Sequence, residues 1–250
     1  MTRDTLTDAT VLAAWQRNAT PWIAAVRGGE IASRKLVTDA AVLDAVLECL
    51  SERTPELGPT RGQKRVLDLG CGEGWLALAL ARHGMAVTGV DAVPELVAAA
   101  RAAGLADCRV LAYEAIAQDA LDLRADVVVC NFSLIGKASV DGLLRAMPAL
   151  LAPHGTLVVQ TLHPLVACGD LPYADGWREG SWAGFSPAFR DAPPWYFRTL
   201  ASWLALIEAS ELALREMREP LDPRSGKPAS VIFVARARPP CLRDVPGGVT

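Results

Sequence analysis

The sequence predicts an α/β fold built on a seven-stranded, mostly parallel sheet with an antiparallel strand near the C-terminus. Three observations lead to this prediction. A short apolar run at residues 66–69 ends in a glycine-rich loop, and an apolar, alanine-rich stretch follows it. Short apolar runs and helix-like patterns then alternate as far as residue 161, an order typical of right-handed βαβ crossovers. Two more strand-like runs lie near the C-terminus, joined by a short proline-containing connection that favours an antiparallel pair.

Length and composition describe a single globular domain with room for one elaborated segment. The chain has 250 residues, 51% of them hydrophobic and 21% charged, and its net charge of −3 is unlike that of nucleic-acid-binding proteins. No apolar run approaches the roughly 18 residues of a membrane span, and the first ten residues lack the apolar region of a signal peptide. The six cysteines are scattered without metal-ligand spacing, so we expect free thiols, no metal site and a cytoplasmic location.

The predicted elements follow from local patterns along the chain. Residues 1–60 show apolar residues at helical spacing, interrupted at Gly28-Gly29, and Thr38 or Asp39 is expected to cap the second helix. Prolines and glycines at residues 55–62 mark a linker. The predicted strands are residues 66–69, 86–90, 108–112, 127–131, 156–161, 213–219 and 230–236, and the predicted helices after the linker are residues 75–83, 95–103, 114–120, 140–151 and 200–209.

The loop after the first strand carries the most informative residues. Its glycines let the backbone turn sharply and let a ligand approach the main chain, and Cys71 is a small side chain that fits among them. Asp68 precedes the loop, and its carboxylate would repel the pyrophosphate of a dinucleotide. The spacing of Gly70, Gly72 and Gly74 also differs from the Gly-x-Gly-x-x-Gly of dinucleotide loops. A ligand with a cationic end suits this loop better, and S-adenosylmethionine has a sulfonium, an ammonium and no phosphate.

Residues 66–74 resemble motif I of class I S-adenosylmethionine-dependent methyltransferases. The resemblance covers residues 65–161 well and the C-terminal strands more weakly. The N-terminal helices and the insertion are loosely similar to those of small-molecule methyltransferases of the ubiquinone pathway. The resemblance implies a Rossmann-like fold with a helical lid over the cofactor at residues 1–62 and a methyltransferase domain at residues 63–238. The polar, proline- and glycine-containing residues 239–250 are expected to be a flexible tail. Arg34, between the two lid helices, could bind the cofactor's carboxylate or be a solvated surface residue.

Two of the strand ends that follow are expected to bind the nucleoside. Asp91, followed by Ala92, ends the second strand, where a carboxylate can accept hydrogen bonds from ribose hydroxyls or cap the next helix. Tyr113, Glu114 and Ala115 follow the third strand. The resemblance implies that a polar side chain there meets the adenine amino group while apolar neighbours cover the ring, although Glu114 could equally be a charge favoured at a helix start.

Two further strand ends are expected near the reacting methyl group. Asn131 and Phe132 end the fourth strand, at the position of the family's motif IV; an ordinary strand-end loop is the alternative. The sequence there differs from the Asn/Asp-Pro-Pro-Tyr/Phe of enzymes that methylate amino groups of nucleic-acid bases, which counts against such a substrate. His163 follows the fifth strand and could act as a general base, or it could satisfy backbone groups of its loop.

The stretch from residue 163 to residue 203 interrupts the alternation of strands and helices and is rich in aromatic residues. As a long insertion after the fifth strand it favours a substrate cap, although a small satellite core is the alternative reading. The substrate-binding candidates combine rings with charges: Trp177, Glu179, Trp182, Tyr196 and Arg198.

Together these residues predict an enzyme that transfers a methyl group from S-adenosylmethionine to an oxygen or nitrogen atom of a small, partly aromatic or apolar acceptor. An NAD(P)-dependent oxidoreductase would share the glycine loop and Asp91 but would not explain Asp68. A non-catalytic S-adenosylmethionine-binding protein is the third possibility. We expect no nucleic-acid or membrane partner, and a monomer or homodimer.

Overall fold

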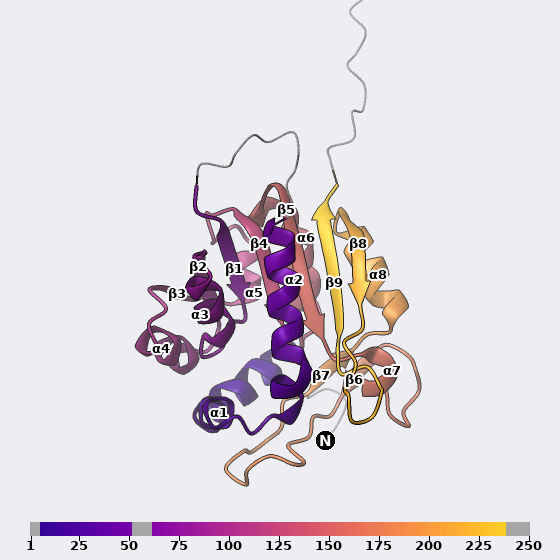
Figure 1. Cartoon of the computed structure of the whole chain (residues 1–250). Helices are drawn as coiled ribbons and strands as arrows, with labels where there is room; N and C mark the ends of the chain where they lie inside the picture. The colour runs from indigo at the N-terminus through magenta and orange to yellow at the C-terminus, as the bar shows by residue number, and fades with distance from the viewer. Residues whose placement is uncertain (1–5, 52–61, 239–250) are drawn as a thin grey trace, which may run out of the picture.

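The computed structural model describes residues 6–51 and 62–238. At its centre lies a seven-stranded sheet in the order β3-β2-β1-β4-β5-β9-β8 (Figure 1). β9 runs antiparallel to both of its neighbours, and the remaining neighbouring pairs are parallel. The strands are β1 (Arg65–Leu69), β2 (Ala86–Asp91), β3 (Asp107–Val110), β4 (Ala125–Asn131), β5 (Leu151–Thr161), β8 (Leu212–Arg218) and β9 (Val231–Ala237). The predicted fold class is confirmed.

Helices cover both faces of this sheet (Figure 1). One face packs against α2 (Asp39–Ser51) and α3 (Trp75–Arg82) through a cluster that includes Val46, Leu80 and Val129. The other face packs against α5 (Tyr113–Ile116), α6 (Ala138–Leu150) and α8 (Leu200–Ala209) through the larger core cluster. α4 (Pro94–Ala102) packs beside α3 and near β3. Nearly continuous burial along β1, β4 and β9 therefore agrees with a three-layer α/β/α arrangement, in which both faces of the sheet are covered.

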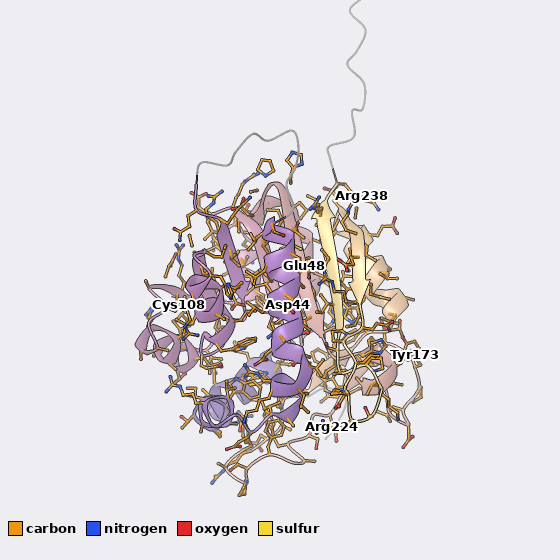
Figure 2. All side chains as sticks on the ribbon, viewed as in Figure 1. Asp44, Glu48, Cys108, Tyr173, Arg224 and Arg238 are labelled. Carbon is orange, nitrogen blue, oxygen red and sulfur yellow. The ribbon has the colours of Figure 1, made fainter. Side chains whose placement is uncertain are left out.

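The helices of the N-terminal segment differ in one respect from the prediction. α1 (Asp8–Gly28) ends where expected, with Gly29 in the left-handed conformation at φ 64°. A π-helix, η2 (Arg34–Thr38), then runs directly into α2, so neither Thr38 nor Asp39 acts as an N-cap. The expected cap is wrong because the backbone is already helical at both residues. Asp44 lies on the exposed face of α2, opposite the buried face that packs on the sheet (Figure 2).

The aromatic insertion, residues 163–203, contains structure that the sequence did not predict. It begins with the short helix α7 (Pro164–Ala167) and contains a separate two-stranded antiparallel sheet, β6 (Gly176–Arg178) with β7 (Trp195–Phe197). Arg178 is buried beneath this sheet and its guanidinium lies 3.5 Å from the centre of the Phe197 ring. The insertion is thus a small folded unit, held partly by cation–π and aromatic contacts.

The lid, residues 6–51, packs on the sheet through α2, and hydrogen bonds hold α1 to the rest of the molecule at two further places. Asp8, at the start of α1, accepts hydrogen bonds from the backbone N–H groups of Lys137 and Ser139, at 2.9 and 3.2 Å. An anion at the start of α6 is stabilised there by free N–H groups and the helix dipole. The amide of buried Asn18 pairs with the backbone of Arg190 in the insertion, donating at 2.6 Å and accepting at 2.9 Å. Lid and insertion are therefore held against each other. In the described part of the chain, no helix is both long and apolar enough to cross a membrane.

Candidate functional site

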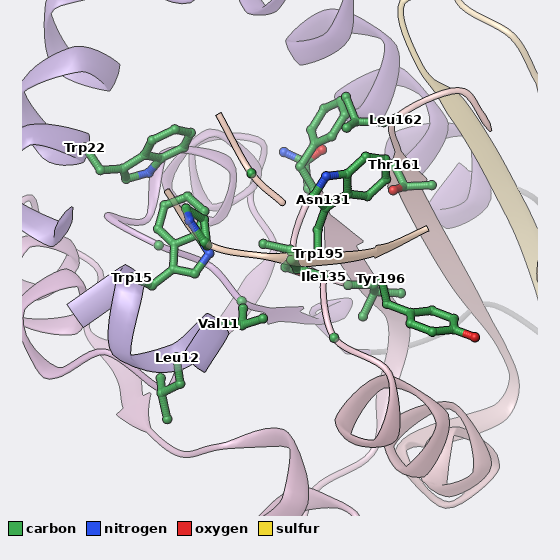
Figure 3. Close-up of a pocket in the computed structure, with 18 of the residues that line it drawn as sticks. Val11, Leu12, Trp15, Trp22, Asn131, Ile135, Thr161, Leu162, Trp195 and Tyr196 are labelled. Atoms are coloured by element: carbon green, nitrogen blue, oxygen red, sulfur yellow. The ribbon is translucent and has the colours of Figure 1, made fainter. Parts of the chain in front are cut away.

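A cavity of about 720 Å³ opens at the carboxyl ends of the parallel strands. Its floor is formed by the loops that follow β1 to β5, and its walls are formed by α1, η2 and the aromatic insertion (Figure 3). The cavity therefore lies where ligands bind in open α/β sheets. The lid supplies Leu12, Trp15 and Trp22, and the insertion supplies Trp182, Phe185 and Trp195.

The glycine loop after β1 is shaped by close contacts. Gly70 has φ 75°, and a Cβ added to it would lie 2.3 Å from Cβ of Ser133 and 2.6 Å from the Tyr113 hydroxyl oxygen. Gly74 has φ 86°, and a Cβ added there would lie 2.9 Å from Cβ of Ala100. Gly74 therefore allows close packing against α4, and it does not line the cavity. Gly72, by contrast, lines the cavity, and a Cβ added to it would meet only Trp22 Nε1, at 3.9 Å. Gly70 and Gly74 therefore leave no room for a side chain.

Three carboxylates gather around this loop. Asp68 is fully buried beneath it, and burial, with additional repulsion from Asp91 and Glu73, raises its pKa to about 8. Burial also raises the pKa of Glu73 and of Asp91. Asp68 Oδ2 and Glu73 Oε1 are buried without a hydrogen-bond partner. Buried carboxylates without partners destabilise the chain unless a cation or donor reaches them, so this cluster suits a positively charged ligand.

The structure corrects the expected position of Asp68 and adds Glu73. Asp68 does not line the cavity, because the glycine loop lies between it and the open space. Glu73 does line the cavity and was not among the predicted site residues. Its place between Gly72 and Gly74 was the signal in the sequence, since a side chain within such a loop lies close to any ligand that the loop holds.

Asp91 ends β2 at the cavity wall, as predicted. Its carboxylate accepts from the backbone N–H of Gly72 and of Val93, both at 2.9 Å. These bonds tie the glycine loop to the residue that precedes α4. The N-cap of α4 is Val93, so Asp91 is not the helix cap that the sequence offered as an alternative. Ala92 lines the cavity beside it, as does Cys71, whose Sγ lies 3.7 Å from that of Cys108.

Two other predicted nucleoside contacts lie at the cavity and one does not. Tyr113 and Glu114 line it, whereas Ala115 does not. The Tyr113 hydroxyl donates to the carbonyl of Leu69 at 3.3 Å, so it supports the loop, while Glu114 is exposed at the start of α5. Of these two polar side chains, Glu114 is therefore the more available to contact a ligand.

Arg34 lies on the cavity wall in η2. Its Nε donates to Asp39 at 3.0 Å, and its guanidinium lies 4.6 Å from the centre of the Trp75 ring. The positive charge of Arg34 also lowers the pKa of Glu73, against the larger effect of burial. Arg34 is consequently a partly buried arginine beside the loop, fixed by Asp39 and Trp75, and not a solvated surface residue.

The substrate-binding candidates divide into two groups. Trp182, Tyr196 and Arg198 line the cavity, but Trp177 and Glu179 do not. Trp177 packs edge-on against Tyr196 with ring centres 5.6 Å apart, so it supports the cavity wall from behind. No residue of β6 is among those that line the cavity, and Glu179 directly follows that strand.

Arg198 is occupied within the protein. Its guanidinium donates to the carbonyls of Gly136 and Lys137 and forms an ion pair with Asp141 at 2.8 Å. It fixes the loop before α6 and has little remaining capacity to orient a substrate. The sequence reasoning missed the apolar wall contributed by the lid, Trp15 and Trp22, whose seven-residue spacing on one helical face was the available signal.

His163 is not placed where a general base would act. It is 1% exposed, does not line the cavity, and its Nε2 lies 2.7 Å from Glu219 Oε1. The ring turns away because Glu219, in the connection after β8, offers a carboxylate on the other side. The expected role of His163 at the reaction mouth therefore has no geometric support, since a base must reach the substrate directly or through one water.

Comparison with known proteins decides the family. A family profile described as a methyltransferase domain matches residues 41–215. The chain belongs to this family of methyltransferase domains. The matched residues include most of α2, the glycine loop, β4 and the whole insertion, residues 163–203, which lines part of the cavity.

Two sets of relatives agree with this assignment. Ubiquinone biosynthesis O-methyltransferases are 36% identical over 126 residues in Xylella fastidiosa (48% of this chain and 49% of the relative) and 40% identical over 105 residues in Xanthomonas campestris (40% and 43%). The chain thus spans about half the length of the curated relatives it matches. An S-adenosylmethionine-dependent methyltransferase structure from Mesorhizobium loti is similar with TM-score 0.57 and 23% identity, covering 79% of this chain and 99% of that one.

A glycopeptide N-methyltransferase solved with S-adenosylmethionine matches with TM-score 0.56 and 17% identity, over 75% of this chain and 100% of that chain. These structural likenesses show the same Rossmann-like fold. They support the resemblance that the glycine loop indicated.

Proposed function

We propose that this protein transfers a methyl group from S-adenosylmethionine to a small-molecule acceptor with a partly aromatic or apolar body, releasing S-adenosylhomocysteine. The observation that carries the proposal is the cluster of Asp68, Glu73 and Asp91 around the glycine loop, with two buried carboxylate oxygens lacking partners. Glu73 and Asp91 line the cavity, where their carboxylates disfavour the pyrophosphate of a nicotinamide dinucleotide and favour a ligand with positive charge. The oxidoreductase alternative is therefore disfavoured.

The residues present fit this cofactor. Asp91 and the backbone of Gly72 would bind the ribose, Glu73 the ammonium and Arg34 the carboxylate, with Tyr113 or Glu114 at the adenine. When bound, the cofactor supplies an electrophilic methyl carbon and a sulfide leaving group. The chain's contribution is to align the acceptor with that carbon and to exclude water, and alignment can be worth several kcal/mol.

The acceptor class follows from the walls of the cavity. Trp15, Trp182, Phe185 and Trp195 surround the part of the cavity between lid and insertion, and rings of this kind bind flat apolar molecules by stacking and burial. A nucleic acid has no complementary charge on a chain with net charge −3. We further expect a cytoplasmic protein that acts as a monomer or homodimer.

Calorimetric titration with S-adenosylhomocysteine and with NADH tests the proposal. We expect micromolar or tighter binding of S-adenosylhomocysteine and none of NADH. Asp91→Ala should weaken the binding of S-adenosylhomocysteine by about 100-fold, because it removes the hydrogen-bond acceptor for the ribose and releases the glycine loop. The matched control is Asp107→Ala, which removes a carboxylate on the edge strand that pairs with Arg109 outside the cavity. Binding of NADH alone would refute the proposal.

A further inference from the structure

A single amide at the end of β4 faces the cavity. Asn131 is the last residue of β4 and lines the cavity, where Figure 3 shows its side chain among the other lining residues. The next residue, Phe132, has φ 51°, a left-handed conformation that is costly for a phenylalanine. Strained backbone of this kind is retained where the surrounding structure requires it, and it is common at functional sites.

The orientation of the Asn131 amide is fixed from behind by Gln160. Gln160 is 1% exposed and lies beside Asn131 in the register of β4 with β5. Its Nε2 donates to the carbonyl of Thr38 at 3.0 Å and to Asn131 Oδ1 at 2.7 Å. Its Oε1 accepts from the hydroxyl of Ser230 at 3.1 Å.

This network allows one arrangement of the two amides. A backbone carbonyl only accepts hydrogen bonds, so the group of Gln160 that faces Thr38 must be its NH₂. The second hydrogen of that NH₂ points at Asn131, whose nearer atom must then be its oxygen. If Asn131 were rotated, two NH₂ groups would face each other in a buried place, at a cost of roughly 1–3 kcal/mol for the unsatisfied groups.

Asn131 Nδ2 consequently remains a donor toward the cavity. Within the described residues, Nδ2 donates no hydrogen bond to the protein, and its neighbours on the wall include the side chains of Phe132 and Leu162. A donor among apolar groups forms a stronger hydrogen bond than one in water. The atom that it meets in a bound acceptor must be able to accept a hydrogen bond.

We propose that Asn131 Nδ2 donates a hydrogen bond to the nucleophilic atom of the acceptor, that Gln160 positions it, and that the acceptor is therefore a hydroxyl compound, a phenol or an alcohol. This inference rests on the proposed methyl transfer. An oxygen keeps a second lone pair for attack while it accepts from Asn131, whereas a neutral amine has one lone pair, which the hydrogen bond would occupy.

The reaction balances with the groups named. The oxygen–methyl bond forms as the carbon–sulfur bond breaks, the sulfur keeps that electron pair, and the hydroxyl proton is released to water. Donation from Nδ2 stabilises the negative charge of the deprotonated oxygen, so it lowers the pKa of a bound phenol. A phenol that ionises near the working pH needs no protein base, whereas an aliphatic alcohol keeps its proton there, so phenols are expected to be the faster acceptors.

The first experiment compares acceptors. The full chain is supplied with S-adenosylmethionine and a panel of phenols and alcohols, together with amines that have the same carbon skeletons, and release of S-adenosylhomocysteine is measured. We expect kcat/KM for the hydroxyl compounds to exceed that for the matched amines by about tenfold or more. Preference for amines, or no turnover of any hydroxyl compound by a chain that binds S-adenosylhomocysteine, overturns this inference alone. Failure to bind S-adenosylhomocysteine overturns the proposed function with it.

The second experiment tests the two residues. Asn131→Asp keeps the shape but replaces the donor with an acceptor, and it should lower kcat/KM for a phenol about 100-fold while the Kd for S-adenosylhomocysteine changes less than about threefold. Gln160→Leu should cause a smaller loss, about tenfold, because the Asn131 amide is then free to rotate. The control is Gln63→Ala, which removes an exposed amide outside the cavity whose Nε2 donates to the carbonyl of Gly84, with activity within about twofold of the parent.

A pH profile separates donation from a structural effect. In Asn131→Ala the acid limb of kcat/KM for a phenol should move about one pH unit upward, because the bound phenol ionises less readily. An equal fall at all pH values, or a loss of S-adenosylhomocysteine affinity as large as the loss of turnover in Asn131→Asp, would assign Asn131 to the cofactor site or to stability instead.

Discussion

Asp68→Asn tests the buried carboxylate beneath the glycine loop. Burial raises the pKa of Asp68 from 3.8 to about 8, so between these pH values the folded chain binds one proton more than the unfolded chain. The contribution of Asp68 to the free energy of unfolding is fully present below pH 3.8 and is lost as the pH rises toward 8. The slope is about 1.4 kcal/mol per pH unit for one proton. For a chain of this size it corresponds to a fall in Tm of about 3 °C per pH unit.

The assay is thermal unfolding of the ligand-free chain between pH 5 and pH 8, within the window set by these two pKa values. The parent should lose stability with rising pH more steeply than Asp68→Asn, by about 3 °C per pH unit, because asparagine does not titrate. Asp122→Asn, which removes an exposed carboxylate before β4, serves as the control for net charge and should follow the parent. Equal slopes for the parent and Asp68→Asn would show that Asp68 is already ionised in the folded state, and the argument from its burial would be refuted.

Three further outcomes follow from contacts described above. Gly70→Ala should abolish S-adenosylhomocysteine binding and lower the free energy of unfolding by at least about 2 kcal/mol more than Gly84→Ala, since both have positive φ but only Gly70 would place a Cβ against Ser133; equal losses in urea unfolding would argue against the clash. Asp8→Ala should destabilise the attachment of the lid by about 1–2 kcal/mol and speed amide hydrogen exchange in α1 but not in α8, because the start of α6 loses its acceptor; unchanged exchange would mean that other contacts hold the lid. Binding of S-adenosylmethionine at pH 7 should release close to one proton from the parent and less from Asp68→Asn, because a nearby cation lowers a carboxyl pKa; calorimetry in buffers of different ionisation enthalpy measures this, and identical release from both chains would contradict it.

The sheet and the glycine loop were predictable because their signals are local. Mainly apolar runs of four to six residues define β1 to β5 in the sequence, and Gly70 and Asp91 mark the ends of the first two. The loop residues Gly70 and Gly72 and the strand-end residue Asp91 lie together at the cavity for the same reason, since the carboxyl ends of parallel strands meet at one edge.

The side chains that long-range contacts orient were not predictable. His163 turns away from the cavity toward Glu219, a partner 56 residues later in the chain. Trp177 lies behind the wall because β6 pairs with β7, a small sheet without a sequence signal of its own. Asn131 was expected beside the methyl group, but the direction of its amide depends on Gln160 and on the backbone of Thr38 in the lid.

The attachment of the lid to the insertion has a consequence for how this fold can diversify. The cofactor side of the cavity is built on strand ends, whereas the apolar wall comes from two segments that the sheet does not constrain. These segments are joined through Asn18 and Arg190 and through the ring contact of Trp15 with Trp182. A chimaera that receives a foreign insertion alone would leave a buried amide and an indole unmatched. New acceptor preferences should therefore arise by exchanging the two segments as a pair, with the strand ends left untouched.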